Sequence, residues 1–307
     1  MSGGVDNAMV TIDLPELIRL KAEARGFSLL PRQPVHSLLS GRHASRLRGR
    51  GLAFEELRHY VQGDDVRTID WKATARLRSP HVRVYTEERE RRVLLVVDQR
   101  SPMFFGSTRA MKSVVAAELT ALAAWRTLMS GDRVGGIVLG DTEIVDLRPR
   151  SSRSAVMRLL HEVARLNKQL ADAPGTPRVT LNQGLEAAVR RAVHDYLVVV
   201  ISDMHGANDD TQRLASRLAA HNDVLMVATY DPLGAALRNL PGMVAATAEG
   251  PCRLPGDAGF TQAFRQTFAD VLSHWQTIFQ ALKVPVLPIS TAEPPVDQLR
   301  ELFGQRG

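Results

Sequence analysis

Two stretches decide the fold: Arg92–Asp98, which reads RVLLVVD, and Tyr196–Asp203, which reads YLVVVISD. Each is a continuous run of β-branched residues and leucine, typical of a strand in the middle of a parallel sheet that is covered on both faces. Each run also ends in an aspartate. We therefore expect a central sheet with helices on both sides and carboxylates gathered at one edge.

The segments around these runs alternate between helical and strand patterns. We expect strands over residues 132–139, 142–147, 224–230 and 286–290, a loop or edge hairpin within 240–258, and helices over 109–129, 154–170, 180–193, 209–220, 260–282 and 295–303. The apolar stripe of 260–282 predicts packing against the sheet rather than a membrane or partner face. This alternation predicts an α/β fold with a doubly wound, mostly parallel sheet. Asp98, Asp203 and Asp231 then lie at its C-terminal edge, where such sheets bind ligands.

The first ninety residues follow a different pattern. Residues 11–30 have helical periodicity, and Pro31 and Pro34 end it. Residues 36–90 are rich in glycine and charge, with short strands of which 81–85 is the clearest. We therefore expect an N-terminal helix or arm (1–35), an arginine-rich segment (36–90) and an α/β domain (91–307). The pattern leaves open whether the arm packs on the domain.

The composition excludes several classes of protein. The chain has 307 residues, of which 44% are apolar and 23% charged, and no apolar run approaches the ~18 residues of a membrane-spanning helix. A single cysteine, Cys252, excludes an internal disulfide framework and a multi-cysteine zinc site. Phosphate-binding loops, the G-x-S-x-G nucleophile motif and the zinc motif H-E-x-x-H are absent from the sequence. We therefore expect a cytoplasmic protein that is not an enzyme.

The excess positive charge lies in the N-terminal third. Residues 19–92 carry 17 basic and 9 acidic side chains, a net charge of +8, whereas the rest of the chain has a net charge of −2. An arginine-rich segment suits either an ion-paired platform or an anion-binding surface. Nucleic-acid binding is therefore an alternative function.

The arginine-rich segment also contains an ordered series of motifs. They are Ser45, Gly49-x-Gly51, Phe54-x-x-Leu57-Arg58-x-Tyr60, Gly63-Asp64-Asp65-x-Arg67-x-Ile69-Asp70-Trp71, Ala75-Arg76 and Tyr85-x-Glu87-Glu88-Arg89. This series strongly resembles the signature of the bacterial "domain of unknown function 58" family. The resemblance implies that the segment is joined to a von Willebrand factor A-like domain with a Rossmann-type sheet. That implication agrees with the α/β pattern after residue 90.

The motif residues allow three interpretations. The simplest is a structural ion-pair platform in which the aspartates cap neighbouring segments or pair with arginines and a tryptophan is buried beneath them. A partner-docking surface is the alternative, and acid–base catalysis by Asp64, Asp65 or Asp70 lacks an accompanying nucleophile or metal-binding set. The platform residues are Arg58, Asp64, Asp65, Arg67, Asp70, Trp71 and Arg76.

The resemblance also implies a metal-ion-dependent adhesion site after the first central strand. The usual pattern, D-x-S-x-S, is altered here: Asp98 is present, but Arg100 and Pro102 replace the serines, and Ser101 is one position out of register. Two readings stay open. Either Mg²⁺ binds a degenerate site, because hard oxygen ligands suit it, or Arg100 replaces the metal with an ion pair. The degenerate site would consist of Asp98, Ser101, Thr180 (with Thr176 as a competitor) and Asp203.

By resemblance, the function would be that of an adaptor. Members of the family resemble parts of systems that contain MoxR-type AAA+ ATPases and other von Willebrand A proteins, so we expect such partners and a role in assembling or activating another complex. A metal-dependent hydrolase using Asp98 and Asp203 is the least favoured alternative, because both hydroxyl ligands are missing.

Overall fold

The structure is a computed structural model that divides the chain into two compact units. One unit contains residues 1–39 and 91–307, and the other contains residues 40–90. The residues described are 9–25, 52–62, 64–87, 90–172, 176–233, 244–247, 250–253 and 284–303, with the single positions 259, 262, 266, 275, 278, 279 and 282. Each unit is described by itself.

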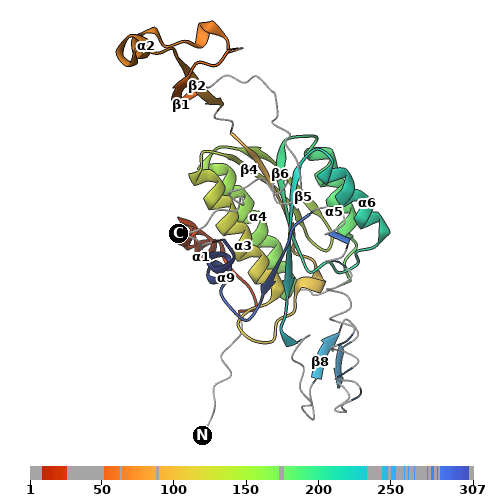
Figure 1. Cartoon of the computed structure of the whole chain (residues 1–307). Coiled ribbons are helices and arrows are strands. Elements are labelled where there is room, and N and C mark those ends of the chain that lie inside the picture. Colours follow the sequence, from red (N-terminus) through yellow and green to blue (C-terminus); the bar gives the residue numbers. More distant parts are fainter. Residues whose placement is uncertain are drawn as a thin grey trace. The chain divides into compact units, whose positions relative to one another are not determined.

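The larger unit is built on a six-stranded sheet with the order β10-β7-β6-β3-β4-β5. Figure 1 shows helices on either side of this sheet. The first five strands in this order are parallel, and β5 runs antiparallel to β4. The two sequence stretches that predict the fold are the adjacent central strands β3 and β6, so the expected α/β fold with a mostly parallel sheet is confirmed. The strands are β3 (Arg92–Asp98), β4 (Arg133–Leu139), β5 (Ile144–Arg150), β6 (Tyr196–Ser202), β7 (Asp223–Tyr230) and β10 (Val286–Ser290).

Helices cover both faces of this sheet, and β3 explains why. Val93, Leu95 and Val97 point into one apolar core, and Leu94 and Val96 point into the other, because successive side chains of a strand face opposite sides. The first core is closed by α1 (Leu14–Arg19), α3 (Lys112–Met129), α4 (Arg153–Asp172) and α9 (Pro295–Phe303), and the second by α5 (Leu181–Arg191) and α6 (Asp209–Ala219). Among the helices that the structure describes, none combines the length and apolar character needed to cross a membrane.

The N-terminal arm packs on the larger unit over its described residues. Leu17 is fully buried, and its carbonyl accepts a hydrogen bond from Trp125 Nε1 at 3.2 Å. The helix in the arm is shorter than the predicted 11–30. It begins at Leu14 because the Asp13 side chain caps it in a capping box with Glu16. A separate 3₁₀ turn, η1 (Glu23–Arg25), follows, and residues 26–35 lie outside the described residues.

A bulge bends the edge strand β5 around a glycine of β4. The register of the two strands shifts between Val134 and Gly136. A Cβ atom added to Gly135 would lie 2.4 Å from the Leu147 carbonyl oxygen and 2.5 Å from the Pro149 nitrogen. These atoms belong to the backbone and cannot move aside cheaply, so the close approach requires glycine.

Residues 244–253 form a short hairpin. Its antiparallel strands are β8 (Val244–Thr247) and β9 (Gly250–Arg253), within the segment predicted as a loop or edge hairpin. The predicted helix over 260–282 lies largely outside the described residues. Its described positions 262, 266, 275, 278 and 279 are helical, and Phe279 is buried in the second core.

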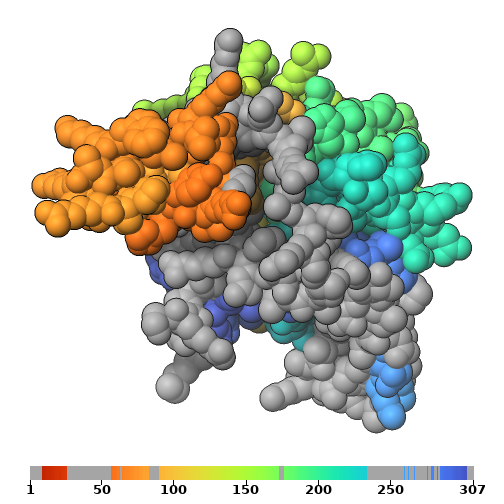
Figure 2. All heavy atoms as spheres, turned by 45° about the horizontal axis from the view of Figure 1, so that its top comes forward, coloured from red at the N-terminus to blue at the C-terminus, as the bar shows by residue number. Residues whose placement is uncertain are grey.

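The smaller unit is a pair of antiparallel strands with a short helix. The strands are β1 (Leu52–His59) and β2 (His81–Glu87), and between them lie the 3₁₀ turn η3 (Val66–Thr68) and the helix α2 (Trp71–Leu77). Hydrogen bonds hold α2 to β2: the Asp70 amide donates to the His81 carbonyl at 2.9 Å, and the His81 amide donates to Thr74 Oγ1 at 3.0 Å. The unit is drawn in orange in the space-filling view of Figure 2.

Candidate functional site

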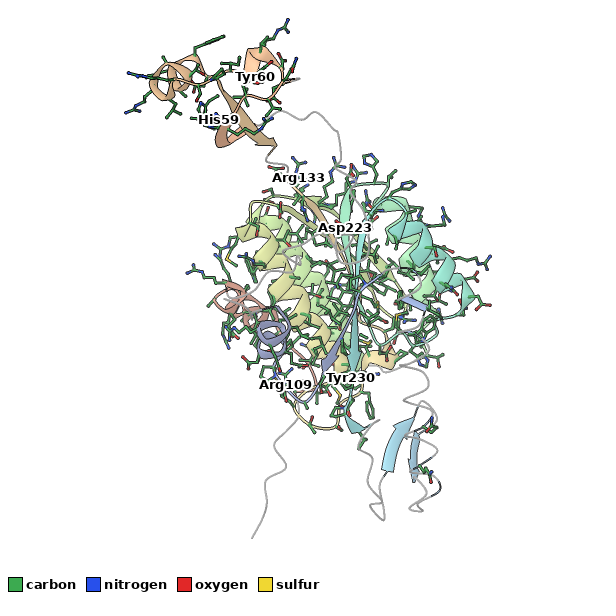
Figure 3. All side chains as sticks on the ribbon, in the orientation of Figure 1. His59, Tyr60, Arg109, Arg133, Asp223 and Tyr230 are labelled. Atoms are coloured by element: carbon green, nitrogen blue, oxygen red, sulfur yellow. The ribbon has the colours of Figure 1, made fainter. Side chains whose placement is uncertain are left out.

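The candidate site lies at the C-terminal edge of the parallel strands in the larger unit. Asp98 is the last residue of β3, and Asp203 directly follows β6. In Figure 3, Tyr230 marks this end of the sheet with Arg109 nearby, and Arg133 and Asp223 mark the opposite end, where β4 and β7 begin. The topology therefore places the aspartates at one edge, as the sequence predicts.

A buried ion pair between Asp98 and Arg100 occupies the centre of this edge. Arg100 Nε donates to Asp98 Oδ1 at 2.9 Å and Arg100 Nη2 donates to Asp98 Oδ2 at 2.7 Å, with side-chain exposures of 3% and 1%. Ser202 Oγ donates to Asp98 Oδ2 at 2.7 Å, and Arg100 Nη2 also donates to the His205 carbonyl at 3.2 Å. This is the two-point geometry in which arginine binds carboxylate most strongly.

The guanidinium of Arg100 stays charged in this buried place. Burial acts to lower the pKa of Arg100, but the hydrogen bonds and negative charge of Asp98, with Asp203 and Asp141 nearby, raise the pKa above its usual value. Arg100 therefore keeps its positive charge wherever arginine is ordinarily protonated.

Each of the four residues expected to bind Mg²⁺ has a protein partner, and Asp98 is paired with Arg100. Ser101 bonds to Asp141 through its hydroxyl and through its amide, the latter at 2.7 Å from Asp141 Oδ1. Thr180 caps α5 by accepting the Gln183 amide at 3.2 Å, and Asp203 forms an ion pair with Lys112. Among the described residues no cluster of three acidic, histidine or cysteine side chains could hold a metal ion.

The geometry of Asp98 also does not fit Mg²⁺. Arg100 takes both of its oxygens and Ser202 shares one of them, so a divalent cation at Asp98 would meet a guanidinium instead of free lone pairs. Of the two interpretations that the sequence leaves open, the structure shows the second, an ion pair between Asp98 and Arg100.

Lys112 and Asp203 form a largely buried ion pair that lies beside the exposed ring of Phe105. Lys112 Nζ lies 5.8 Å from the centroid of the Phe105 ring, a cation–π arrangement, and Phe105 is 44% exposed. The His205 amide donates to Asp203 Oδ1 at 2.9 Å, which fixes the carboxylate in the loop after β6. Sequence reasoning missed Lys112, although it is one of only five lysines and lies at the start of a helix.

A buried polar chain links this edge to the N-terminal arm. Gln99 Nε2 donates to the Ser113 carbonyl at 2.8 Å, and Asn167 Nδ2 donates to Gln99 Oε1 at 2.9 Å. The Ile12 amide then donates to Asn167 Oδ1 at 3.0 Å. Gln99 and Asn167 are fully buried. The only signal in the sequence is an asparagine within the apolar stripe of a helix, and the pattern alone does not reveal its partners.

Asp231 holds two loops and the last strand together at the same edge. It accepts hydrogen bonds from the Ser107 amide at 2.8 Å, the Ser107 hydroxyl at 2.5 Å and the Thr291 hydroxyl at 2.5 Å. Its oxygens are therefore committed to structure.

In the smaller unit each aspartate of the motif has a structural bond. Asp64 is bound at two points by Arg58, at 2.7 and 2.8 Å. The hydrogen bond from Arg58, followed by that from the Val61 amide, holds the pKa of Asp64 below its usual value. Asp65 caps η3 through the Arg67 amide at 2.9 Å, and Asp70 caps α2 through the amides of residues 72 and 73.

The expectation that Trp71 is a buried anchor is wrong. Its side chain is 70% exposed. Trp71 is the first residue of α2, directly after the Asp70 cap, and the face of α2 that bonds to β2 is the one that carries Thr74. Arg67 and Arg76, which the sequence analysis offered as partners of the aspartates, are exposed and form no ion pair among the described residues.

Taken together, the architecture is that of a mostly parallel α/β domain with an ion-paired C-terminal edge and a separate arginine-rich unit. The chain belongs to the family described as "Protein of unknown function DUF58", whose model matches residues 56–271. The resemblance seen in the motifs is therefore confirmed.

Other proteins are similar to this chain over much of its length. Uncharacterized proteins of Mycobacterium bovis and of two Mycobacterium tuberculosis strains are 29% identical over 231 residues, which are 75% of this chain and 71% of theirs. Among solved structures, the conserved hypothetical protein BatB from Bacteroides thetaiotaomicron matches with a TM-score of 0.42 and 13% identity. The match covers 69% of this chain and 98% of that one.

Proposed function

We propose that this protein is a non-catalytic adaptor whose larger unit is a von Willebrand factor A-like domain that binds partners without a metal ion. The observation that carries the proposal is the guanidinium of Arg100, which lies against Asp98 where an adhesion site of that class would hold a cation. The strand order, with a reversal at β3 and β6 and an antiparallel edge strand, supports the choice of domain class.

The bonding of the edge supports an adaptor rather than an enzyme. Catalysis by acid and base needs a group that can exchange protons with a substrate. Here Asp98, Asp141 and Asp231 each accept hydrogen bonds that hold loops in place. What the edge offers to a partner is the ring of Phe105, which lies beside the largely buried ion pair of Lys112 and Asp203.

The identity of the partner in this proposal rests on the family resemblance. We propose a MoxR-type AAA+ ATPase, with other von Willebrand A proteins as further members of the assembly. The setting would be the bacterial cytoplasm, where such an ATPase works.

The test is a binding titration between the full-length protein and a purified MoxR-type ATPase from the same organism, without nucleotide. Binding should be equally tight in EDTA and in Mg²⁺. Phe105→Ala should weaken it by about tenfold, as for an aromatic anchor in an interface. Val193→Ala is the matched control, because Val193 is 66% exposed and lies three residues before β6, at the opposite edge of the sheet.

Three outcomes would count against the proposal. Loss of binding in EDTA would contradict the metal-free mode of binding, and failure of the ATPase to bind under either condition would remove the proposed partner. Equal losses in both variants would show that the C-terminal edge is not the binding surface.

A further inference from the structure

We propose that the outward face of α2, formed by Trp71, Lys72 and Arg76, is a docking surface for an acidic, partly apolar segment of a partner protein. This face belongs to the smaller unit. The proposal is thus independent of binding at the edge of the larger sheet, and either can fail without the other.

The bonding of α2 fixes which of its faces is free. Thr74 turns toward β2, where its hydroxyl accepts the His81 amide. Residues of a helix follow one another at about 100°, so residues 71, 75, 72 and 76 lie, in that order, on the arc of α2 that faces away from residues 73 and 74 taken together. All four of these residues are exposed, whereas residues 73 and 74 are half-buried.

Most of the exposed large apolar side chains in the described part of the chain belong to the smaller unit. Trp71 has the highest exposure among the large apolar side chains described, whereas Trp125 of the larger unit is fully buried. Clustered exposed apolar side chains mark interaction sites on proteins. Of nine such exposed residues in the described part of the chain, five fall in this short stretch: Leu57, Val61, Val66, Trp71 and Leu77.

The charges around Trp71 indicate the chemical character of the segment that would bind there. Asp64 is neutralised by Arg58, and Asp65 and Asp70 are turned to the amides that they cap. Lys72 and Arg76 form no ion pair with any described carboxylate. The face therefore combines a tryptophan with two cations that no carboxylate of the described residues neutralises, and its complement is a segment with carboxylates next to an apolar side chain. Tryptophan and arginine are the residues most often found at the energetic centre of protein interfaces.

The same features disfavour a polyanion or a lipid surface. Residues 57–82 carry five basic and three acidic side chains, a net charge of only +2, whereas nucleic-acid affinity comes mainly from many phosphate contacts. Among the described Phe, Trp and Tyr side chains of this unit only Trp71 is exposed, whereas binding of single-stranded nucleic acid uses several stacking platforms. The helix α2 has seven residues, too short for a membrane-surface helix.

The experiment selects ligands for the full-length protein from a random-peptide phage library. Selected peptides are then measured as synthetic peptides against Trp71→Ala and against the double variant Lys72→Glu, Arg76→Glu. The matched controls are Leu302→Ala, an exposed apolar residue of the larger unit, and Lys168→Glu, an exposed lysine of α4. A random-sequence DNA duplex and vesicles of phosphatidylglycerol serve as competing probes. Hydrogen exchange of the His81 amide shows that α2 remains attached in each variant.

The expected result is enrichment of peptides that combine Asp or Glu with apolar residues. Trp71→Ala and the charge reversal should each weaken their binding by at least about tenfold, with both controls unchanged. Peptides without acidic enrichment, or equal binding to Trp71→Ala and to the controls, would overturn the proposal. So would tighter binding of DNA or vesicles that the same two variants abolish.

Discussion

Arg100 is the residue on which the candidate edge depends, because a carboxylate at 1% exposure needs a counter-charge. We expect Arg100→Ala to lower the free energy of unfolding by about 3–5 kcal/mol, since it leaves Asp98 buried without its partner. Chemical denaturation at neutral pH measures this loss.

A double variant tests whether the unpaired charge of Asp98 alone accounts for the loss of unfolding free energy. Asp98→Asn combined with Arg100→Met keeps an acceptor for the Ser202 hydroxyl and removes both charges. This pair should be markedly more stable than Arg100→Ala alone. A double variant that is as unstable as the single one would show that the geometry of Arg100, and not charge compensation, holds the loop.

Asp64 makes a pH-dependent contribution to the smaller unit. Its pKa in the folded protein lies below the usual value of 3.8 because of Arg58 and the Val61 amide. The stabilisation is therefore present above that pH and is lost as the pH falls through the lowered pKa. The chemical shift of the Val61 amide, which donates to Asp64 at 2.9 Å, reports this titration.

We expect Arg58→Ala to raise the pKa of Asp64 toward its usual value. Arg67→Ala is the control, since its side chain forms no ion pair among the described residues. The same titration midpoint in both variants would mean that Arg58 does not set the pKa of Asp64.

The partners and the burial of individual side chains were harder to predict from the sequence than the residues that form the site. The motif offers Arg58 as one of several possible partners of Asp64, and the structure pairs the two because a short turn places them close together. The motif misplaces Trp71, because burial depends on which side of α2 faces β2, and the periodicity of a seven-residue helix does not decide that. It also leaves Asp203 without its partner Lys112, because the two are brought together only by the crossing of β6 and α3.

At the scale of elements, the arm is tied to the candidate edge through Asn167. We expect Asn167→Leu to cost about 1–3 kcal/mol for each polar group that it leaves buried and unpaired, namely the Ile12 amide and Gln99 Oε1. Hydrogen exchange of the Ile12 amide should become faster, by the factor that corresponds to the free energy lost at this amide. Lys168→Ala, one residue further along α4 and exposed, should change neither. Unchanged exchange at Ile12 in Asn167→Leu would mean that the arm is held by its apolar contacts alone.

The bulge between β4 and β5 makes a second prediction at this scale. Gly135→Ala should lower the melting temperature, because its Cβ meets backbone atoms of β5, at a cost of about 1–3 kcal/mol. Gly136→Ala is the comparison: its closest contact, at 2.5 Å, is the end of the flexible Leu159 side chain, so a smaller loss is expected. The reverse order of the two losses would contradict this account of the bulge.

The elements themselves were largely predictable. Strands and helices after residue 90 start and end within a few residues of the predicted positions, because buried runs and helical stripes there are long and unbroken. The arm was predicted too long, since its helix is limited by a capping residue rather than by its apolar periodicity.

At the scale of the whole molecule, the division into two units predicts that they fold separately. Replacing residues 40–90 by a flexible glycine–serine linker should leave the larger unit folded, because the described residues of that segment supply no strand to its sheet and no residue to either core. Circular dichroism and the hydrogen-exchange protection of β3 and β6 measure this. A truncated protein without a cooperative unfolding transition would mean that the segment is part of the larger fold.

The two outer strands of the six-stranded sheet each contain a proline, Pro149 in β5 and Pro288 in β10. A proline has no amide hydrogen to offer to an incoming strand, and β5 is further distorted by its bulge and carries Arg148 and Arg150. The sheet is therefore poorly suited to β-augmentation, in which a partner adds a strand of its own. A partner that binds at this sheet is then expected to contact its side chains rather than its main chain. For the same reason, copies of the protein should resist edge-to-edge growth into fibrils even when concentrated.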